Sequence, residues 1–179
     1  MKMVALLRGI NVGGNRKVPM PKLIEIVKNA GFTEVQTYIN SGNLVFEVKK
    51  IKPELVALKL EKVIENEFKF KVDVIVRTKA QWKKYSVCSP FPAAESIRPN
   101  MLHLGLAKNP LNENIAQSLD EKARNGEKIK VIGDAIWIDF AKSVGNSKLS
   151  PVALDKAAGS SVTMRNWNTV LKLDRMLDE

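Results

Sequence analysis

Apolar residues in the first half of the chain recur with two different periods. Stretches in which every second residue is apolar are typical of strands, and stretches with apolar residues three and four positions apart are typical of helices. Prolines stand where a helix would begin, and glycines stand where a helix would end. The pattern predicts the order strand, helix, strand, strand, helix, strand. In sequence, these elements are a strand at 3–8, a helix from Pro19 or Pro21 to Gly31, strands at 35–39 and 44–48 around a turn at 41–43, a helix at 53–68 and a strand at 72–77.

The pattern restarts near residue 101 and predicts a second set of elements. Asn109-Pro110 is expected to open a helix that ends at Gly126, and Thr163 is expected to cap the last helix. In sequence, the second set is a strand at 101–107, the helix from Pro110, strands at 128–133 and 135–140, a helix from Ser150-Pro151 to Gly159, and a helix from about Arg165 to Leu177.

The two sets of elements predict an α+β fold. We expect two tandem ferredoxin-like halves of the βαββαβ type, with the second half ending in helices. Prolines and glycines stand at matching places in both halves, which favours a duplicated plan. Prolines and glycines at the ends of elements also occur in unrelated α+β chains. The expected division is a first half over 1–88, a linker or crossing loop over 89–99, and a second half over 100–179.

The composition adds information about partners and location. Apolar residues make up 45% of the chain, which is enough for a folded core, and no apolar run approaches the roughly 20 residues that cross a bilayer. The 29 Lys and Arg residues exceed the 19 Asp and Glu residues, so the net charge is +10. This excess favours a polyanionic partner, and solubility alone is the alternative explanation. We expect a cytoplasmic protein without membrane association.

Cysteine and histidine occur once each, as Cys88 and His103. A single cysteine cannot form an internal disulfide, and one cysteine with one histidine cannot form a zinc site by themselves. We therefore expect no metal, no cofactor and no disulfide-linked partner. His103 lies within a predicted strand, where a packed, hydrogen-bonded histidine is the alternative to a proton carrier.

Five segments of the chain resemble one known family. They are "LLRGINVGGNRKVPM" (6–20), "GFTEVQTYINSGNLVF" (31–46), "LH" (102–103), "NSKL" (146–149) and "TMRNWNTVLKL" (163–173). On these segments the chain resembles the bacterial domain-of-unknown-function family 1697. The resemblance implies a duplicated, ferredoxin-like α+β fold in a bacterial protein. It implies no activity, substrate or cofactor.

The loop after the first strand is the first candidate ligand site. Gly13 and Gly14 allow backbone N–H groups to turn toward an anion near the start of the next helix. Arg8 would supply positive charge and Asn11 a hydrogen-bonding amide. The spacing matches neither the Walker phosphate loop nor the G-x-G-x-x-G dinucleotide loop. A flexible connection between a strand and a helix is the alternative interpretation.

Two further loops carry candidate ligand-binding groups. In "YINSGNLVF", Ser41 and Asn43 lie near the tip of a predicted hairpin, and turn formation alone also explains this segment. In "GNSKLSP", Ser147 and Lys148 precede a predicted helix, where a hydroxyl, an ammonium and helix N–H groups suit a phosphate or carboxylate. An ordinary helix-starting loop is the alternative there.

The segment "TMRNWNTV" combines a cation, two amides and a tryptophan. Arg165 is able to bind an anion through two parallel hydrogen bonds, and Asn166 is a second candidate ligand residue. Asn166 is also suited to tie a neighbouring loop to the helix. The spacing of Trp167 with Val170 and Leu171 predicts that the tryptophan is part of the core.

Three functions remain open at the level of sequence. The first is binding of an anionic, phosphate-bearing ligand in a cleft between the two halves. The second is an enzyme for a small phosphorylated substrate, with Arg165 and Lys148 stabilising charge and His103 or an aspartate carrying protons. The third is a nucleic-acid-binding or protein-interaction module. The first strand lacks the aromatic residues on which RNA-recognition modules stack bases.

Overall fold

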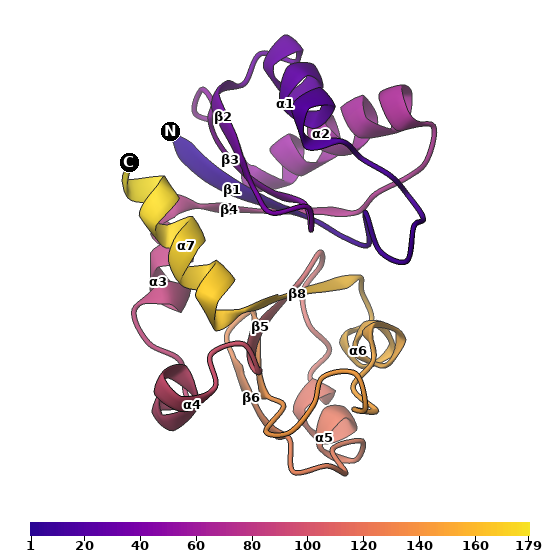
Figure 1. Cartoon of the computed structure of the whole chain (residues 1–179), viewed down its shortest axis with the longest axis vertical. Helices are drawn as coiled ribbons and strands as arrows, with labels where there is room; N and C mark the ends of the chain where they lie inside the picture. The colour runs from indigo at the N-terminus through magenta and orange to yellow at the C-terminus, as the bar shows by residue number, and fades with distance from the viewer. The chain divides into compact units, whose positions relative to one another are not determined.

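The computed structural model describes residues 1–179, which form two compact units (Figure 1). The first unit consists of Met1–Lys83 and Leu173–Glu179, and the second consists of Lys84–Lys172. Each unit contains a four-stranded antiparallel sheet with strands and helices in a βαββαβ-like order. The predicted α+β fold class is therefore confirmed.

In the first unit, two helices cover one face of the sheet. The elements are β1 (Lys2–Leu7), α1 (Met20–Asn29), β2 (Thr33–Tyr38), β3 (Asn43–Glu47), α2 (Pro53–Phe68) and β4 (Val74–Thr78). The strand order is β2-β3-β1-β4, so β1 pairs with both β3 and β4. Figure 1 shows α1 and α2 on the same side of this sheet. The order of elements is the predicted one.

The core of the first unit follows from the two apolar periods. Leu23 and Val27 of α1, and Leu60 and Ile64 of α2, are buried in one cluster with alternate residues of the strands. Phe46 belongs to the same cluster. Full burial of one such side chain stabilises a fold by roughly 1.5–3 kcal/mol. The helical and strand periods therefore determine which face of each element meets the other.

The second unit repeats this plan with the strand order β6-β7-β5-β8. Its elements are α4 (Pro92–Ile97), β5 (Leu102–Ala107), α5 (Ile115–Asp120), β6 (Lys128–Ile132), β7 (Ala135–Asp139), α6 (Pro151–Ala158) and β8 (Val162–Asn166). Leu119 of α5 and Leu154 of α6 are buried with Ile136 and Ile138 of β7. The boundaries between the units fall inside two helices, α3 (Lys79–Ser86) and α7 (Trp167–Asp178).

Residues 89–99 and the start of helix α5 differ from their predictions. Residues 89–99, expected to be a linker or crossing loop, contain the helix α4. Helix α5 begins at Ile115 and not at Pro110. The residues before it are held in a non-helical path by Asn112, whose backbone N–H donates to Ala158 O at 3.3 Å and whose Nδ2 donates to Ala157 O at 3.2 Å.

Thr163 was expected to cap a last helix that begins at about Arg165, and this prediction is wrong. Residues 162–166 form the strand β8, which pairs with β5 from Ala107↔Val162 to His103↔Asn166. The pairing with β5 satisfies backbone groups that a helix would satisfy within itself. Thr163 therefore lies in a strand. The cap of α7 is Asn166, whose Oδ1 accepts a hydrogen bond from Thr169 N at 3.0 Å.

Candidate functional site

The structure limits the kinds of site that the side chains form. No group of three or more His, Cys, Asp or Glu side chains is placed to hold a metal ion. None of the helices is both long and apolar enough to cross a membrane.

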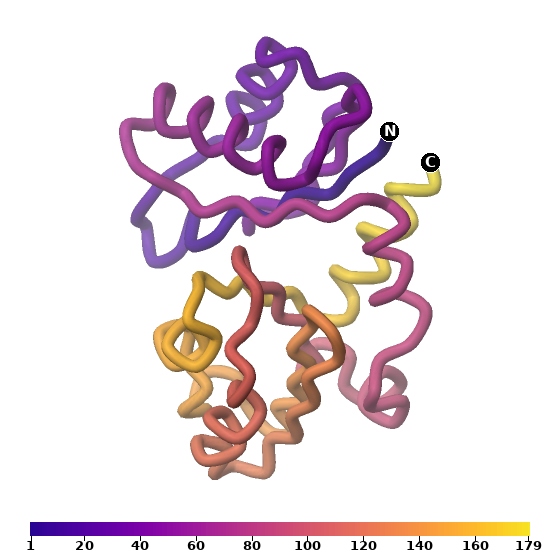
Figure 2. The backbone as a smooth tube through the Cα atoms, turned by 180° about the vertical axis from the view of Figure 1, so that it is seen from behind, coloured from indigo at the N-terminus to yellow at the C-terminus, as the bar shows by residue number.

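The glycine-rich loop after β1 is a small hairpin. Asn15 N donates to Val12 O at 3.1 Å, and Asn11 N donates to Arg16 O at 3.2 Å. Gly13 and Gly14, between them, have φ angles of +59° and +79°, which is the combination that a two-residue type I′ turn requires. Figure 2 shows this indigo segment leaving the sheet after β1 and turning back before α1. We call residues 11–17 the finger.

The side chain of Asn11 holds the base of the finger. Its Nδ2 donates to Val18 O at 3.0 Å and to Asn40 O at 2.8 Å, and its Oδ1 accepts from Val18 N at 2.8 Å. The second of these bonds joins the finger to the loop between β2 and β3. The structure thus brings together two of the predicted segments, and it uses the amide of Asn11 to do so.

Replacing Asn11 by Asp is expected to lower the free energy of unfolding of the first unit by about 2 kcal/mol, because a carboxylate cannot donate to the Val18 and Asn40 carbonyls. The matched control is Asn15→Asp, which makes the same charge change in the exposed turn and is expected to cost less than about 0.5 kcal/mol. Urea denaturation of both variants measures the difference. Equal costs would show that Asn11 does not hold the finger.

The turn between β2 and β3 is packed tightly against β1. Gly42 O accepts a hydrogen bond from Leu7 N at 2.7 Å. Asn43 is fully buried, and its Nδ2 donates to Tyr38 O at 2.9 Å and to Ser41 Oγ at 3.0 Å. Ser41 and Asn43, both predicted ligand residues, thus hydrogen-bond to each other within this turn. Arg8, at the end of β1, is partly buried, and its backbone N–H donates to Asp73 O at 3.0 Å.

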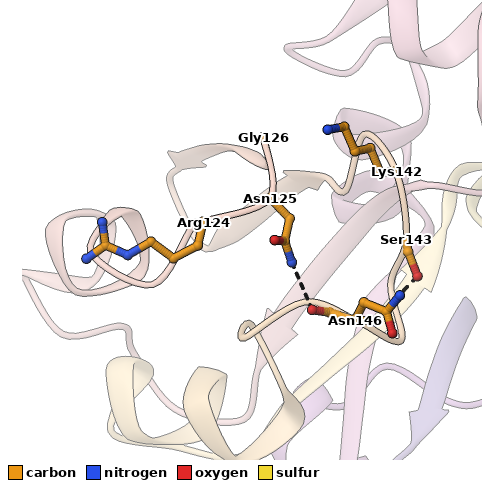
Figure 3. Close-up of a pocket in the computed structure, with 6 residues that line it drawn as sticks. All are labelled: Arg124, Asn125, Gly126, Lys142, Ser143 and Asn146. Carbon is orange, nitrogen blue, oxygen red and sulfur yellow. Dashed lines mark hydrogen bonds between the residues drawn. The ribbon is translucent and has the colours of Figure 1, made fainter.

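A polar pocket in the second unit adjoins the predicted "NSKL" segment. Its volume is about 360 Å³, and it is lined by Arg124, Asn125, Gly126, Lys142, Ser143 and Asn146 (Figure 3). We call it the Arg124 pocket. The lining contains two cations, two amides and a hydroxyl, and it contains no carboxylate. Such a lining suits an anion.

A hydrogen bond joins the two loops that form the Arg124 pocket, because Asn125 Nδ2 donates to Asn146 O at 2.8 Å. Within the second loop, Asn146 N donates to Ser143 Oγ at 3.4 Å. Figure 3 shows the side chains of Arg124 and Lys142 on opposite sides of the contact between Asn125 and Asn146. Both cations are exposed, and in Figure 3 the guanidinium of Arg124 extends away from Asn125 and Asn146. To contact a ligand, each cation would have to turn toward it, which costs up to roughly 2 kcal/mol of side-chain entropy.

Glu127 holds together the two loops of the Arg124 pocket, and this role was not predicted from the sequence. Its Oε1 accepts a hydrogen bond from Ser147 Oγ, and its Oε2 accepts one from Asn125 N at 2.7 Å. Burial works to raise the pKa of Glu127, but the hydrogen bonds from Ser147 and from backbone N–H groups outweigh it and lower the pKa. The carboxylate is therefore ionised at neutral pH, and its charge is directed at these donors.

The predicted residues of the "NSKL" segment have different surroundings. Ser147 Oγ donates to Glu127 and accepts from Leu149 N at 3.1 Å, so its hydroxyl is used within the loop. Lys148 is exposed. Ser150 caps α6, because its Oγ accepts from Ala153 N at 3.3 Å. The loop is thus a helix-starting loop that also forms one wall of a pocket.

Arg165 and Asn166 lie on β8 and hydrogen-bond within the second unit. Arg165 is 8% exposed, and its Nη1 donates to Thr163 Oγ1 and to Met164 O, both at 2.8 Å. Burial lowers the pKa of Arg165 to about 10, which leaves the guanidinium protonated at pH 7. Trp167 is buried as predicted, with its ring 5.8 Å from that of Trp137.

His103 lies on the face of the sheet that α5 and α6 cover. Its ring meets that of Phe140 edge to face at 5.2 Å, and its Nδ1 lies 3.2 Å from Met101 O. Burial lowers the pKa of His103 below its ordinary value, although the contact with Met101 O works in the opposite direction. The imidazole is therefore neutral at pH 7 and packed, which matches the alternative interpretation of this residue.

Comparison with known proteins places the chain in a family and supports the fold. A family model described as "Protein of unknown function (DUF1697)" matches residues 1–137. The chain is also similar to a solved structure described as that of the conserved bacterial protein SP0830 from Streptococcus pneumoniae, with 25% identity and a TM-score of 0.74 over 98% of each chain. Curated proteins give no match.

Proposed function

From the premise that the chain belongs to the DUF1697 family, whose description names no activity, we propose that it binds a small phosphate-bearing anion in the Arg124 pocket. The observation that carries the proposal is the lining of this pocket. The residues that line its volume of about 360 Å³ supply two cations, two amides, a hydroxyl and a glycine, and none of them is a carboxylate.

The chemistry of these groups favours phosphate over an uncharged ligand. A guanidinium such as that of Arg124 donates two parallel hydrogen bonds to a phosphate, and Lys142 adds a point charge from the other side. The Ser143 hydroxyl and the Asn146 amide supply neutral donors. Gly126 has a φ of +83°, and a Cβ there would meet no atom within 4 Å.

The size of the pocket favours a small ligand. Ligand pockets typically have volumes of roughly 300–1,000 Å³, and the Arg124 pocket lies at the lower end of this range. A phosphate or a phosphorylated metabolite of a few carbons fits such a volume. A large cofactor would extend into solvent on most of its surface.

The walls of the pocket are held in place before a ligand arrives. The bond from Asn125 to Asn146 O and the bonds from Ser147 and Asn125 to Glu127 fix the two loops relative to each other. Preorganisation of this kind reduces the ordering cost of binding. Binding rather than catalysis is proposed, because His103, one of the candidate proton carriers beside an aspartate, packs against Phe140.

A thermal-shift screen with inorganic phosphate, sugar phosphates and nucleotides tests this proposal. A ligand present at 100 times its Kd is expected to stabilise the protein by about 2.7 kcal/mol, which raises the Tm of a chain of this size by roughly 5–10 °C. The double variant Arg124→Gln/Lys142→Gln is expected to lose this increase.

The matched control for this experiment is Lys130→Gln/Lys156→Gln. It removes the same charge from exposed positions of the second unit that do not line the pocket. The control is expected to keep the full increase in Tm. The proposal fails if no phosphate compound raises the Tm of the wild type, or if the control loses the increase to the same extent.

A further inference from the structure

The finger of the first unit is a second candidate binding surface, and the Arg124 pocket does not involve it. Its type I′ turn and its two cross-hairpin hydrogen bonds give it a defined shape. Its base is anchored by the Asn11 amide and flanked by Ile10 and Val18, which are each 1% exposed. The tip, in contrast, is exposed, with Val12 at 67%. The finger is thus a short, supported projection rather than a loose connection.

The strain around the finger also points to a function. Ile39, next to the residue whose carbonyl accepts from Asn11, has a φ of +50° and is 52% exposed. A β-branched residue in the left-handed region is unusual, and such residues cluster at functional sites. An exposed isoleucine at this position contributes little to folding.

The finger carries a positive charge that neighbouring acids in the sequence do not offset. Residues 1–24 contain five Lys or Arg residues and no Asp or Glu. Arg16 and Lys17 of the finger are exposed. The first acid along the chain, Glu25, forms an ion pair with Lys22 at 2.9 Å. The charge of the finger therefore favours a polyanion.

We infer that the finger contacts the phosphodiester backbone of duplex nucleic acid through Arg16 and Lys17. The finger is a short hairpin with a single β-bridge, Val12↔Asn15, and a hairpin of two chain segments is narrow enough for the major groove of DNA, which is about 12 Å wide. None of the large apolar side chains exposed on the protein is aromatic, and single-strand binding depends on aromatic rings that stack bases. These two observations favour a duplex over a single strand.

An acidic protein surface would offer the same charge, but the finger fits it less well. Protein interfaces depend on a few large apolar or aromatic anchors that become fully buried. Within the finger, Val12 is the one apolar side chain. Phosphate contacts require no such anchor, because release of counterions supplies most of the binding free energy.

Fluorescence anisotropy with a labelled DNA duplex of about 20 base pairs, the matching RNA duplex and the separate strands tests this inference over salt concentrations of about 50–200 mM. The variant Arg16→Gln/Lys17→Gln is expected to bind a duplex about tenfold more weakly. The slope of log K against log salt is expected to fall in magnitude by about 1.8, because each lost phosphate contact removes about 0.9.

The matched control is Lys49→Gln/Lys50→Gln, which makes the same charge change. These two exposed lysines lie near the start of β1, because they follow β3 and the last residue of β3 pairs with Lys2. The finger follows the other end of β1. The control is expected to bind within about twofold of the wild type. Thermal melts of both variants check that they remain folded.

Four results would overturn the inference. The first is that the wild type does not bind either duplex at the lowest salt concentration. The second is that both variants weaken binding equally, which would mean that only net charge matters. The third is tighter binding of the separate strands than of the duplexes. The fourth is binding of a poly-glutamate peptide through Arg16 and Lys17 without binding of a duplex, which would assign the finger to an acidic protein.

Discussion

Replacing Gly42 by Ala is expected to lower the free energy of unfolding of the first unit by about 3 kcal/mol or more. A Cβ at this position would lie 2.7 Å from Leu7 Cβ and 2.9 Å from Ile10 Cδ1. Both neighbours are buried, so neither is free to move away. The φ of +81° adds the cost of roughly 1–2 kcal/mol for a side chain in the left-handed region, and the forced contacts add roughly 1–3 kcal/mol.

The chain offers a matched control for this prediction. Gly14 has nearly the same φ, +79°, but a Cβ there would meet no atom within 4 Å. Gly14→Ala is therefore expected to cost only the conformational part, roughly 1–2 kcal/mol. Urea denaturation followed by tryptophan fluorescence measures both variants. If the two substitutions cost the same, the contact of the turn with Leu7 and Ile10 is not as close as the structure shows.

The second large effect is expected at Asp139, which holds helix α4 to the sheet of the second unit. Its carboxylate is 1% exposed and accepts from Arg98 Nε at 2.9 Å and Arg98 Nη2 at 2.6 Å, and also from Ala141 N at 3.0 Å. Asp139→Asn keeps the shape but turns an amide NH₂ toward the guanidinium. The expected loss is about 2–3 kcal/mol, which is less than the roughly 3–5 kcal/mol for fully buried pairs because the Arg98 side chain is 30% exposed.

The control for Asp139 is Asp178→Asn in α7. Asp178 forms ion pairs with Lys79 at 2.9 Å and with Lys83 at 3.5 Å, but all three side chains are about half exposed. Exposed ion pairs contribute little to stability because solvent and salt screen them. No measurable change is expected. If Asp178→Asn lowers the free energy of unfolding as much as Asp139→Asn does, burial is not what makes the Asp139 pair stabilising.

The pH dependence of stability provides an independent check on Asp139. The hydrogen bonds from Arg98 lower the pKa of Asp139 below its ordinary value, and they outweigh the opposing effect of burial. A depressed folded-state pKa contributes stability that is present above the unfolded-state pKa, about 3.9, and is lost as the pH falls through the folded-state pKa. The wild type is therefore expected to lose more stability below this pH than Asp139→Asn does.

Local periodicity predicted most of the fold because most elements are defined by their own residues. The helix over 53–68 has its apolar positions at helical spacing and a proline at its start, and the structure gives the same bounds. β8 could not be predicted in this way. Its pairing partner, β5, lies about 60 residues earlier in the chain, and that pairing decides between strand and helix for a short segment beside a helix.

The loop chemistry was harder to predict than the elements. Gly13 and Gly14 indicated positive φ angles correctly, but a phosphate cradle and a type I′ turn place the same demand on φ. The Arg124 pocket combines loops around residues 124–126 and 142–146, which no local pattern connects. The residues around Glu127 in the sequence do not indicate its role, because that role depends on the fold, which brings Ser147 to it.

The most direct test of the proposed function is an NMR titration that locates the ligand. Inorganic phosphate, and then the compound that gives the largest thermal shift, would be added to the ¹⁵N-labelled protein. We predict that the largest amide shifts occur at Asn125, Gly126, Ser143 and Asn146, and that they are absent in Arg124→Gln/Lys142→Gln. Saturating shifts confined to other residues, or no saturating shifts with any phosphate compound, would contradict the assignment of the Arg124 pocket as an anion site.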